Sequence, residues 1–137
     1  MYHDSHLYDA EDTVVYQTDE YGGSHTDIDA TERFTDDIDL TVDTEANVHF
    51  TFDGSDATDD LVLTLYKRND SSWSDNEAGW KAAITVTNAG TETEYHYTIP
   101  AAYGAGHYRF GIKSSGATTS FELQVAVRQS RITRSKA

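Results

Sequence analysis

At residues 37–43 the sequence reads DIDLTVD, in which apolar and polar residues alternate. Successive side chains of a β-strand point to opposite faces, so this alternation predicts a strand with one buried and one solvated face. The pattern returns along the chain as far as residue 127. We expect the core to form from these alternating residues, with Phe50, Leu63, Phe110 and Leu123 at its centre. The other alternating sets are Val48/Phe50/Phe52, Leu61/Leu63/Leu65, Tyr95/Tyr97/Ile99, Tyr108/Phe110/Ile112 and Phe121/Leu123/Val125/Val127.

The repeated strands predict an all-β fold: an antiparallel β-sandwich, jelly-roll or immunoglobulin-like, with seven or eight strands and an extended N-terminal arm. Turn-forming residues separate the expected strands. These strands cover residues 32–35, 37–43, 46–53, 61–67, 82–88, 94–99, 106–113 and 119–128. We therefore assign residues 32–128 to the sandwich, residues 1–31 to the arm and residues 129–137 to a basic C-terminal tail.

The N-terminal segment, residues 1–31, is polar and acidic and has too few apolar residues to order itself alone. Only the stretch around Val14, Val15 and Tyr16 is typical of a strand, and it could extend the sheet edge of a neighbouring molecule. Tyrosine suits contact surfaces because it offers a large area at low entropic cost. Two interpretations stay open, an arm ordered by a neighbour and a loose leader. The tyrosines expected to bind a partner are Tyr2, Tyr8, Tyr16 and Tyr21.

Charge is divided unevenly along the chain, which has a net charge of −14. Residues 1–66 hold 18 acidic side chains and one basic side chain, whereas residues 67–137 hold 6 acidic and 9 basic ones. An acidic surface opposes nucleic-acid binding, since phosphate contacts supply most of that affinity. The basic cluster at the C-terminus includes Arg131 and Arg134. It is either a solvated tail or a patch that docks on an acidic partner.

The chain has no cysteine, no apolar run long enough to span a membrane and no signal-peptide pattern at its start. We expect a protein that is made in the host cytoplasm and does not enter a membrane. No nucleophile lies in a strand-to-helix turn, and the one glycine pair near residue 104 is not followed by a helix. These patterns predict that the protein is not an enzyme.

The loop at residues 53–60 is rich in aspartate, and calcium favours such oxygen-rich loops. Its spacing departs from the twelve-residue calcium loop, so an ordinary aspartate-rich turn is the competing interpretation. The candidate metal ligands are Asp53, Asp56 and Asp59; otherwise no cofactor is expected. None of the histidines has a spacing that brings ligands together, and we expect solvated or cross-strand side chains. These histidines are His3, His6, His25, His49, His96 and His107.

The longest interruption between expected strands, residues 68–81, holds both tryptophans, Trp73 and Trp80. Long loops often carry function, and tryptophan can stack on sugar rings. The competing role for both side chains is to close one end of the core beneath the loop. The loop therefore gives a candidate glycan-binding site at Trp73 and Trp80.

The second half of the chain resembles the bacterial pre-peptidase C-terminal sandwich domain over about residues 37–128. The similarity rests on four successive segments, LVLTLY at 61–66, YHYTIP at 95–100, AGHYRFGI at 105–112 and FELQV at 121–125. In that family a strand ending in tyrosine, a strand ending in proline, an Ala-Gly strand and a closing Phe-x-Leu-x-Val strand occur in this order. The resemblance implies a β-sandwich. The family's place at the ends of secreted proteases is not carried over.

The whole chain is also similar in style to small structural proteins of tailed bacteriophages, which often are cysteine-free β-sandwiches with a polar leader. This resemblance implies a virion protein, a capsid decoration or cement protein that binds the outer shell through its arm and sandwich edge. The implied partner is the major capsid protein or another virion protein, with self-association into a homo-oligomer. The alternatives are a binding module for glycan or calcium and a phage tail or receptor-binding component.

Overall fold

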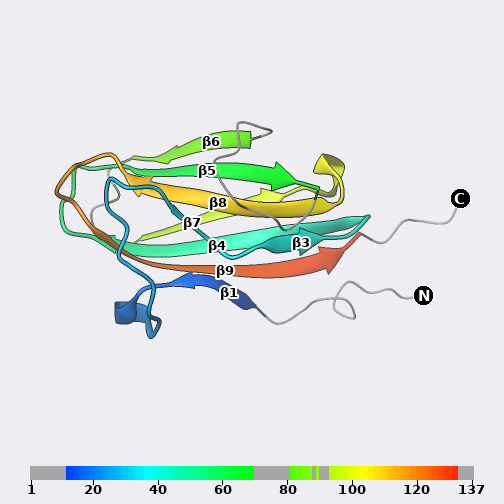
Figure 1. The fold of residues 1–137 in the computed structure, drawn as a ribbon, viewed down its shortest axis with the longest axis horizontal. Coiled ribbons are helices and arrows are strands. Elements are labelled where there is room, and N and C mark those ends of the chain that lie inside the picture. The colour runs from blue at the N-terminus through cyan, green and yellow to red at the C-terminus, as the bar shows by residue number, and fades with distance from the viewer. Residues whose placement is uncertain (1–11, 70–80, 88, 90–92, 133–137) are drawn as a thin grey trace, which may run out of the picture.

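A computed structural model describes residues 12–69, 81–87, 89 and 93–132. Two antiparallel sheets face each other and form a β-sandwich, which confirms the fold class predicted from the alternating pattern (Figure 1). Within the described ranges no helix is long and apolar enough to cross a membrane. The only helical turns there are two short 3-10 segments, η2 (Asp19–Tyr21) and η3 (Ala101–Tyr103).

The first sheet has the strand order β1-β9-β4-β7 and the second has the order β2-β8-β5-β6, with β3 also paired to β8. The long strands β4 and β9 pair along their whole length, from Thr44↔Arg131 to Gly54↔Phe121. The strands are β1 (Thr13–Gln17), β2 (Arg33–Phe34), β3 (Ile38–Leu40), β4 (Thr44–Gly54), β5 (Leu61–Arg68), β6 (Lys81–Val86), β7 (Thr93–Ile99), β8 (Gly106–Ser114) and β9 (Phe121–Arg131).

The core lies between the sheets and consists of the alternating apolar residues, as predicted. Phe50, Leu63, Phe110 and Leu123 have no exposed surface. Val42 departs from the pattern because β3 ends at Leu40 and residues 42 and 43 form a turn in which Asp43 has a φ of 61°. Its side chain is 70% exposed. The apolar alternation therefore continues to Val42, two residues beyond the end of the strand that it forms.

Residues 12–31 belong to the sandwich, which corrects the expected boundary between an arm and the sandwich at residue 31. Strand β1 pairs with β9 of the same chain, from Thr13↔Val127 to Gln17↔Gln124. Val15, Tyr16 and Ile28 are buried in the core. Residues 1–11 lie outside the described part, so the arm proper is at most these residues. The last strand likewise extends to Arg131, beyond the expected end of the sandwich at residue 128.

A bulge in β1 explains why the sequence pattern did not indicate that this segment contributes to the core. The pairing register shifts between Val14 and Tyr16, so the adjacent residues Val15 and Tyr16 both face the core. Strand β1 also contacts the segment that joins β2 to β3 of the second sheet. The backbone N–H of Asp36 in this segment donates to the carbonyl of Val15 over 2.9 Å. Strand β1 is therefore an integral edge of this chain's own sheet.

Candidate functional site

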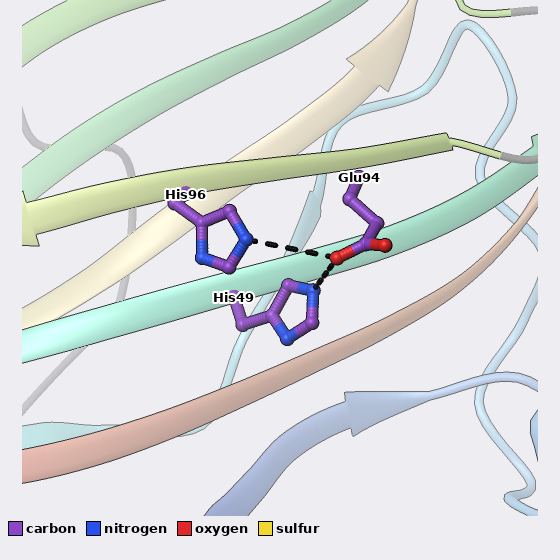
Figure 2. Close-up of side chains that lie close together, drawn as sticks. All are labelled: His49, Glu94 and His96. Atoms are coloured by element: carbon purple, nitrogen blue, oxygen red, sulfur yellow. Dashed lines mark hydrogen bonds and ion pairs between the residues drawn. The ribbon is translucent and has the colours of Figure 1, made fainter.

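The outer face of the first sheet brings two histidines and a glutamate together. His49 on β4 and His96 on β7 are direct cross-strand partners, and Glu94 precedes His96 by two residues on the same face of β7. The imidazole rings are stacked, with centroids 4.3 Å apart and planes 14° from parallel. Figure 2 shows both rings turned toward the carboxylate of Glu94. The strand pairing alone therefore builds a three-residue cluster on solvent-facing positions.

The donor atoms of this cluster, which we call the His–Glu–His cluster, converge on one carboxylate oxygen. Nε2 of His49 lies 2.8 Å from Oε1 of Glu94, at hydrogen-bond distance. Nε2 of His96 lies 3.6 Å from the same oxygen. The three side chains are 41%, 71% and 61% exposed for His49, His96 and Glu94 respectively. The cluster is accessible to solutes and also has room for its side chains to rotate.

A shallow hollow of about 360 Å³ adjoins the cluster on the same face. Ala126 of β9 pairs opposite His49, and its small side chain leaves space where a larger residue would fill the surface. On one side the hollow is bounded by Asp12 and Arg128, which form an ion pair with Nε of Arg128 3.0 Å from Oδ1 of Asp12. Burial raises the pKa of Tyr97, another lining residue, and a hydrogen bond with Tyr103 adds to this effect.

Sequence reasoning missed this cluster because His49 and His96 are separated by a predicted turn, a long loop and other strands. The available signal was that both residues occupy polar positions of alternating strands. That signal places each histidine on an outer face, but it does not say which strands become neighbours. The expectation of cross-strand histidines holds for this pair, whereas the expectation that the histidines do not converge is wrong here.

Two of the three candidate calcium ligands, Asp56 and Asp59, accept hydrogen bonds within the chain. Asp56 accepts hydrogen bonds from the backbone N–H and the hydroxyl of Thr58, and these bonds lower its pKa. Asp59 accepts a hydrogen bond from the Thr119 hydroxyl, and Asp53 lies at the end of β4 opposite Glu122. In the described residues these three carboxylates do not form a group of converging metal ligands.

A second acidic group lies where η2 and the following loop meet the start of β9. Carboxylate oxygens of Asp19, Asp27 and Glu122 lie within 4.8 Å of one another. Burial raises the pKa of Asp27, and the charge of Glu122 and a hydrogen bond with it contribute further. Glu122 also accepts a hydrogen bond of 2.7 Å from the Thr18 hydroxyl. Part of the hydrogen-bonding capacity of these carboxylates is therefore used by contacts within the chain.

Of the residues expected to bind a partner, some are buried, some are exposed and some lie outside the described ranges. Val15 and Tyr16 are buried in this chain's own core, and Tyr16 stacks on His25 with ring centroids 4.4 Å apart, so neither side chain is available to a partner. Val14 and Arg131 are exposed, and Tyr21 is half-buried in η2. The remaining expected residues lie outside the described ranges: Tyr2, Tyr8 and Arg134, together with the tryptophans Trp73 and Trp80.

The C-terminal end of the described chain lies at one end of the sandwich (Figure 1), beside the turn between β3 and β4. The backbone N–H of Ile132 donates to the carbonyl of Asp43 over 2.6 Å, which fixes the chain end against that turn. We call this region, residues 41–43 and 131–132, the terminal end. It carries two of the large apolar side chains that are exposed in the described ranges, Val42 and Ile132, whereas the third, Val14, pairs with Ala126 at the middle of β9.

A hollow of about 410 Å³ opens beside the exposed Val42. Its walls come from the end of β3, the turn after it, and the start of β8, and they include His107. Nδ1 of His107 lies 2.7 Å from Oδ2 of Asp37. The terminal end therefore combines exposed apolar side chains with a concave surface, the arrangement expected of a contact site.

No family model, curated protein or solved structure matches this chain. The function must accordingly be inferred from the two surface features described above, the terminal end and the His–Glu–His cluster.

Proposed function

We propose that this protein is a virion structural protein, a capsid decoration or cement protein that docks on the outer shell through its terminal end. The virion setting comes from the resemblance of the chain to small tailed-phage sandwiches. The observation that carries the docking surface is the exposure of Val42 and Ile132 beside each other at the terminal end. Exposed apolar side chains are common singly, but neighbouring ones beside a hollow mark interaction sites.

The C-terminal segment continues from Ile132 at the terminal end, and the N-terminal segment enters β1 at Asp12, which forms an ion pair with Arg128 of β9. Residues 1–11 hold three acidic side chains and no basic one, whereas residues 133–137 hold two basic side chains and no acidic one. A partner with a basic patch for residues 1–11 and an acidic patch for residues 133–137 would be contacted at two points of opposite charge. Such pairing of charges favours one orientation of docking and raises the association rate. In this proposal Tyr2, Tyr8, Arg131 and Arg134 contact the shell.

The partner proposed is the major capsid protein or another virion protein that forms a repeating surface. A repeating shell holds many copies of the sandwich near one another, which is consistent with self-association into a homo-oligomer. The acidic remainder of the molecule would face away from the shell and repel nucleic acid. No catalytic step is required of any residue in this role.

Cosedimentation with tailed-phage shells prepared from the same source as the protein tests the proposal. The wild-type protein should sediment with the shells, and Val42→Asp should reduce the bound fraction at least about tenfold, the effect expected when a central contact worth about 1.4 kcal/mol is lost. Ala57→Asp adds the same charge in an exposed turn at the opposite end of the sandwich and should leave binding unchanged. Equal binding of both variants would reject the terminal end as the docking surface. Failure of the wild-type protein to bind any shell protein would reject the virion role.

A further inference from the structure

We propose that His49, His96 and Glu94 form a binding site for a divalent transition-metal ion of the Zn²⁺ class. This inference is independent of the docking role, because it concerns the outer face of the first sheet and not the terminal end. Two imidazole nitrogens and one carboxylate oxygen make up a donor set that suits Zn²⁺ better than calcium or magnesium, which prefer oxygen ligands alone.

The backbone already holds the three ligands at positions from which one ion can be reached. The atoms Nε2 of His49, Nε2 of His96 and Oε1 of Glu94 all lie within 4.8 Å of one another. Zinc bonds to nitrogen and to carboxylate oxygen are about 2.0–2.2 Å long. Two atoms bound to the same ion therefore lie closer together than 4.8 Å, so the three ligand atoms must approach one another when the ion binds. Because the three side chains are exposed, rotation about their side-chain bonds can close the remaining gap without moving either strand.

The hydrogen bond between His49 and Glu94 occupies the place that the ion would take. When the ion binds, the neutral His49 ring carries its proton on Nδ1, so that Nε2 and the carboxylate oxygen of Glu94 can both become metal ligands. The Thr51 hydroxyl, 3.5 Å from the same nitrogen, also gives up its contact. The outer face therefore exchanges these two contacts of His49 for three metal bonds, which favours binding.

The surroundings leave a coordination position open. All three side chains are exposed, so a water molecule or a carboxylate or imidazole from another molecule can reach an ion bound between them. A three-ligand site with one open position is the arrangement of zinc sites that bind an exchangeable fourth ligand. The net charge of −14 also favours accumulation of cations at the surface.

The acidic group of Asp19, Asp27 and Glu122 is a weaker candidate for the same ion. It offers only oxygen ligands, and Glu122 and Asp27 are engaged by hydrogen bonds within the chain. Asp27→Asn therefore serves as a control that removes one ligand of that group and leaves the His–Glu–His cluster intact.

Isothermal titration of the full chain with Zn²⁺ in a buffer that does not bind metals tests the site. The double variant His49→Asn/His96→Asn should lose one Zn²⁺ equivalent per chain, and Glu94→Gln should weaken binding at that site at least about tenfold, the lower end of what even an outer-shell partner contributes. The matched control is His3→Asn/His6→Asn, which also removes two histidines but outside the described residues. It should retain the equivalent that the first double variant loses, as should Asp27→Asn.

Nitrogen-15 spectra of the histidine rings provide a second measurement that does not depend on stoichiometry. Addition of Zn²⁺ to the wild-type protein should shift the ring resonances of His49 and His96 together, and should leave those of His107 in place. Far-ultraviolet circular dichroism should show that each variant is folded, which is expected because all three cluster side chains are exposed. Zn²⁺ binding by the folded His49→Asn/His96→Asn variant with wild-type stoichiometry and affinity would overturn the proposal.

Discussion

The rings of Phe50 and Phe110 meet edge to face, with centroids 5.1 Å apart and planes at 90°. Phe50 belongs to β4 of the first sheet and Phe110 to β8 of the second, so this contact joins the two layers at the centre of the core. Tyr97 makes a second edge contact with Phe110, at 5.9 Å. Both phenylalanines have no exposed surface, so each fills space that no solvent can occupy.

Replacing Phe110 with alanine should lower the free energy of unfolding by about 3–5 kcal/mol, because the change removes buried apolar surface and leaves a cavity between the sheets. Urea denaturation followed by tryptophan fluorescence measures this loss. Lys113→Ala, at an exposed position of the same strand, should change stability by less than about 0.5 kcal/mol. Equal unfolding midpoints for the two variants would mean that Phe110 is not at the core.

We expect that residues 1–11 can be removed without loss of the fold, whereas residues 12–31 cannot. Removal of residues 1–31 takes away β1 and the buried side chains of Val15, Tyr16 and Ile28, and should unfold the domain or lower its melting temperature steeply. Removal of residues 1–11 leaves all of these in place and should keep the fold. Thermal melts followed by circular dichroism compare the two. A 32–137 fragment that melted like the full chain would show that β1 is dispensable.

Asp27→Asn should raise the melting temperature at neutral pH, and the gain should shrink as the pH falls. Burial and the nearby Glu122 raise the pKa of Asp27 in the folded chain. A carboxyl with a raised folded-state pKa contributes stability at low pH, and this contribution is lost as the pH rises through that pKa. The uncharged amide avoids the loss, so its benefit is absent below the unfolded-state pKa and complete above the folded-state pKa. Melting curves from pH 3 to pH 8 provide the measurement.

Asp36→Asn is the control for this prediction, because Asp36 is exposed and its replacement removes the same charge from the chain. It should produce a smaller change at neutral pH. If both variants gained stability equally, the cause would be the general excess of negative charge and not the Asp27–Glu122 contact.

Gly54→Ala should destabilise the sandwich because an added methyl group would lie 2.5 Å from Cε1 of Phe121 and 3.1 Å from the carbonyl oxygen of Ala89. Overpacking of this kind costs about 1–3 kcal/mol. Phe121→Leu removes the ring edge that the methyl group would strike. In a double-mutant cycle measured by urea denaturation, the loss caused by Gly54→Ala should be smaller in the Phe121→Leu background. Strict additivity would place the clash elsewhere.

The class of fold and most of the core follow from the alternating pattern of the sequence. Alternation of apolar and polar residues is a local property, since a strand's side chains point to its two faces in turn whatever the strand pairs with. Phe50, Leu63, Phe110 and Leu123 could therefore be assigned to the interior before any strand order was known. The same rule failed for Val15 and Tyr16, because the bulge in β1 turns two consecutive side chains to one face.

Only the tertiary structure decided which outer faces meet. His49 and His96 lie far apart in the chain, and they become partners because β4 and β7 pair in one register. Strand β1 adds to β9 of its own sheet, and the backbone N–H of Ile132 donates to the carbonyl of Asp43 at the terminal end. These are long-range pairings, and a two-residue period is equally compatible with other strand orders. The alternating sequence therefore fixes which residues are buried, while strand order fixes which surface residues can act together.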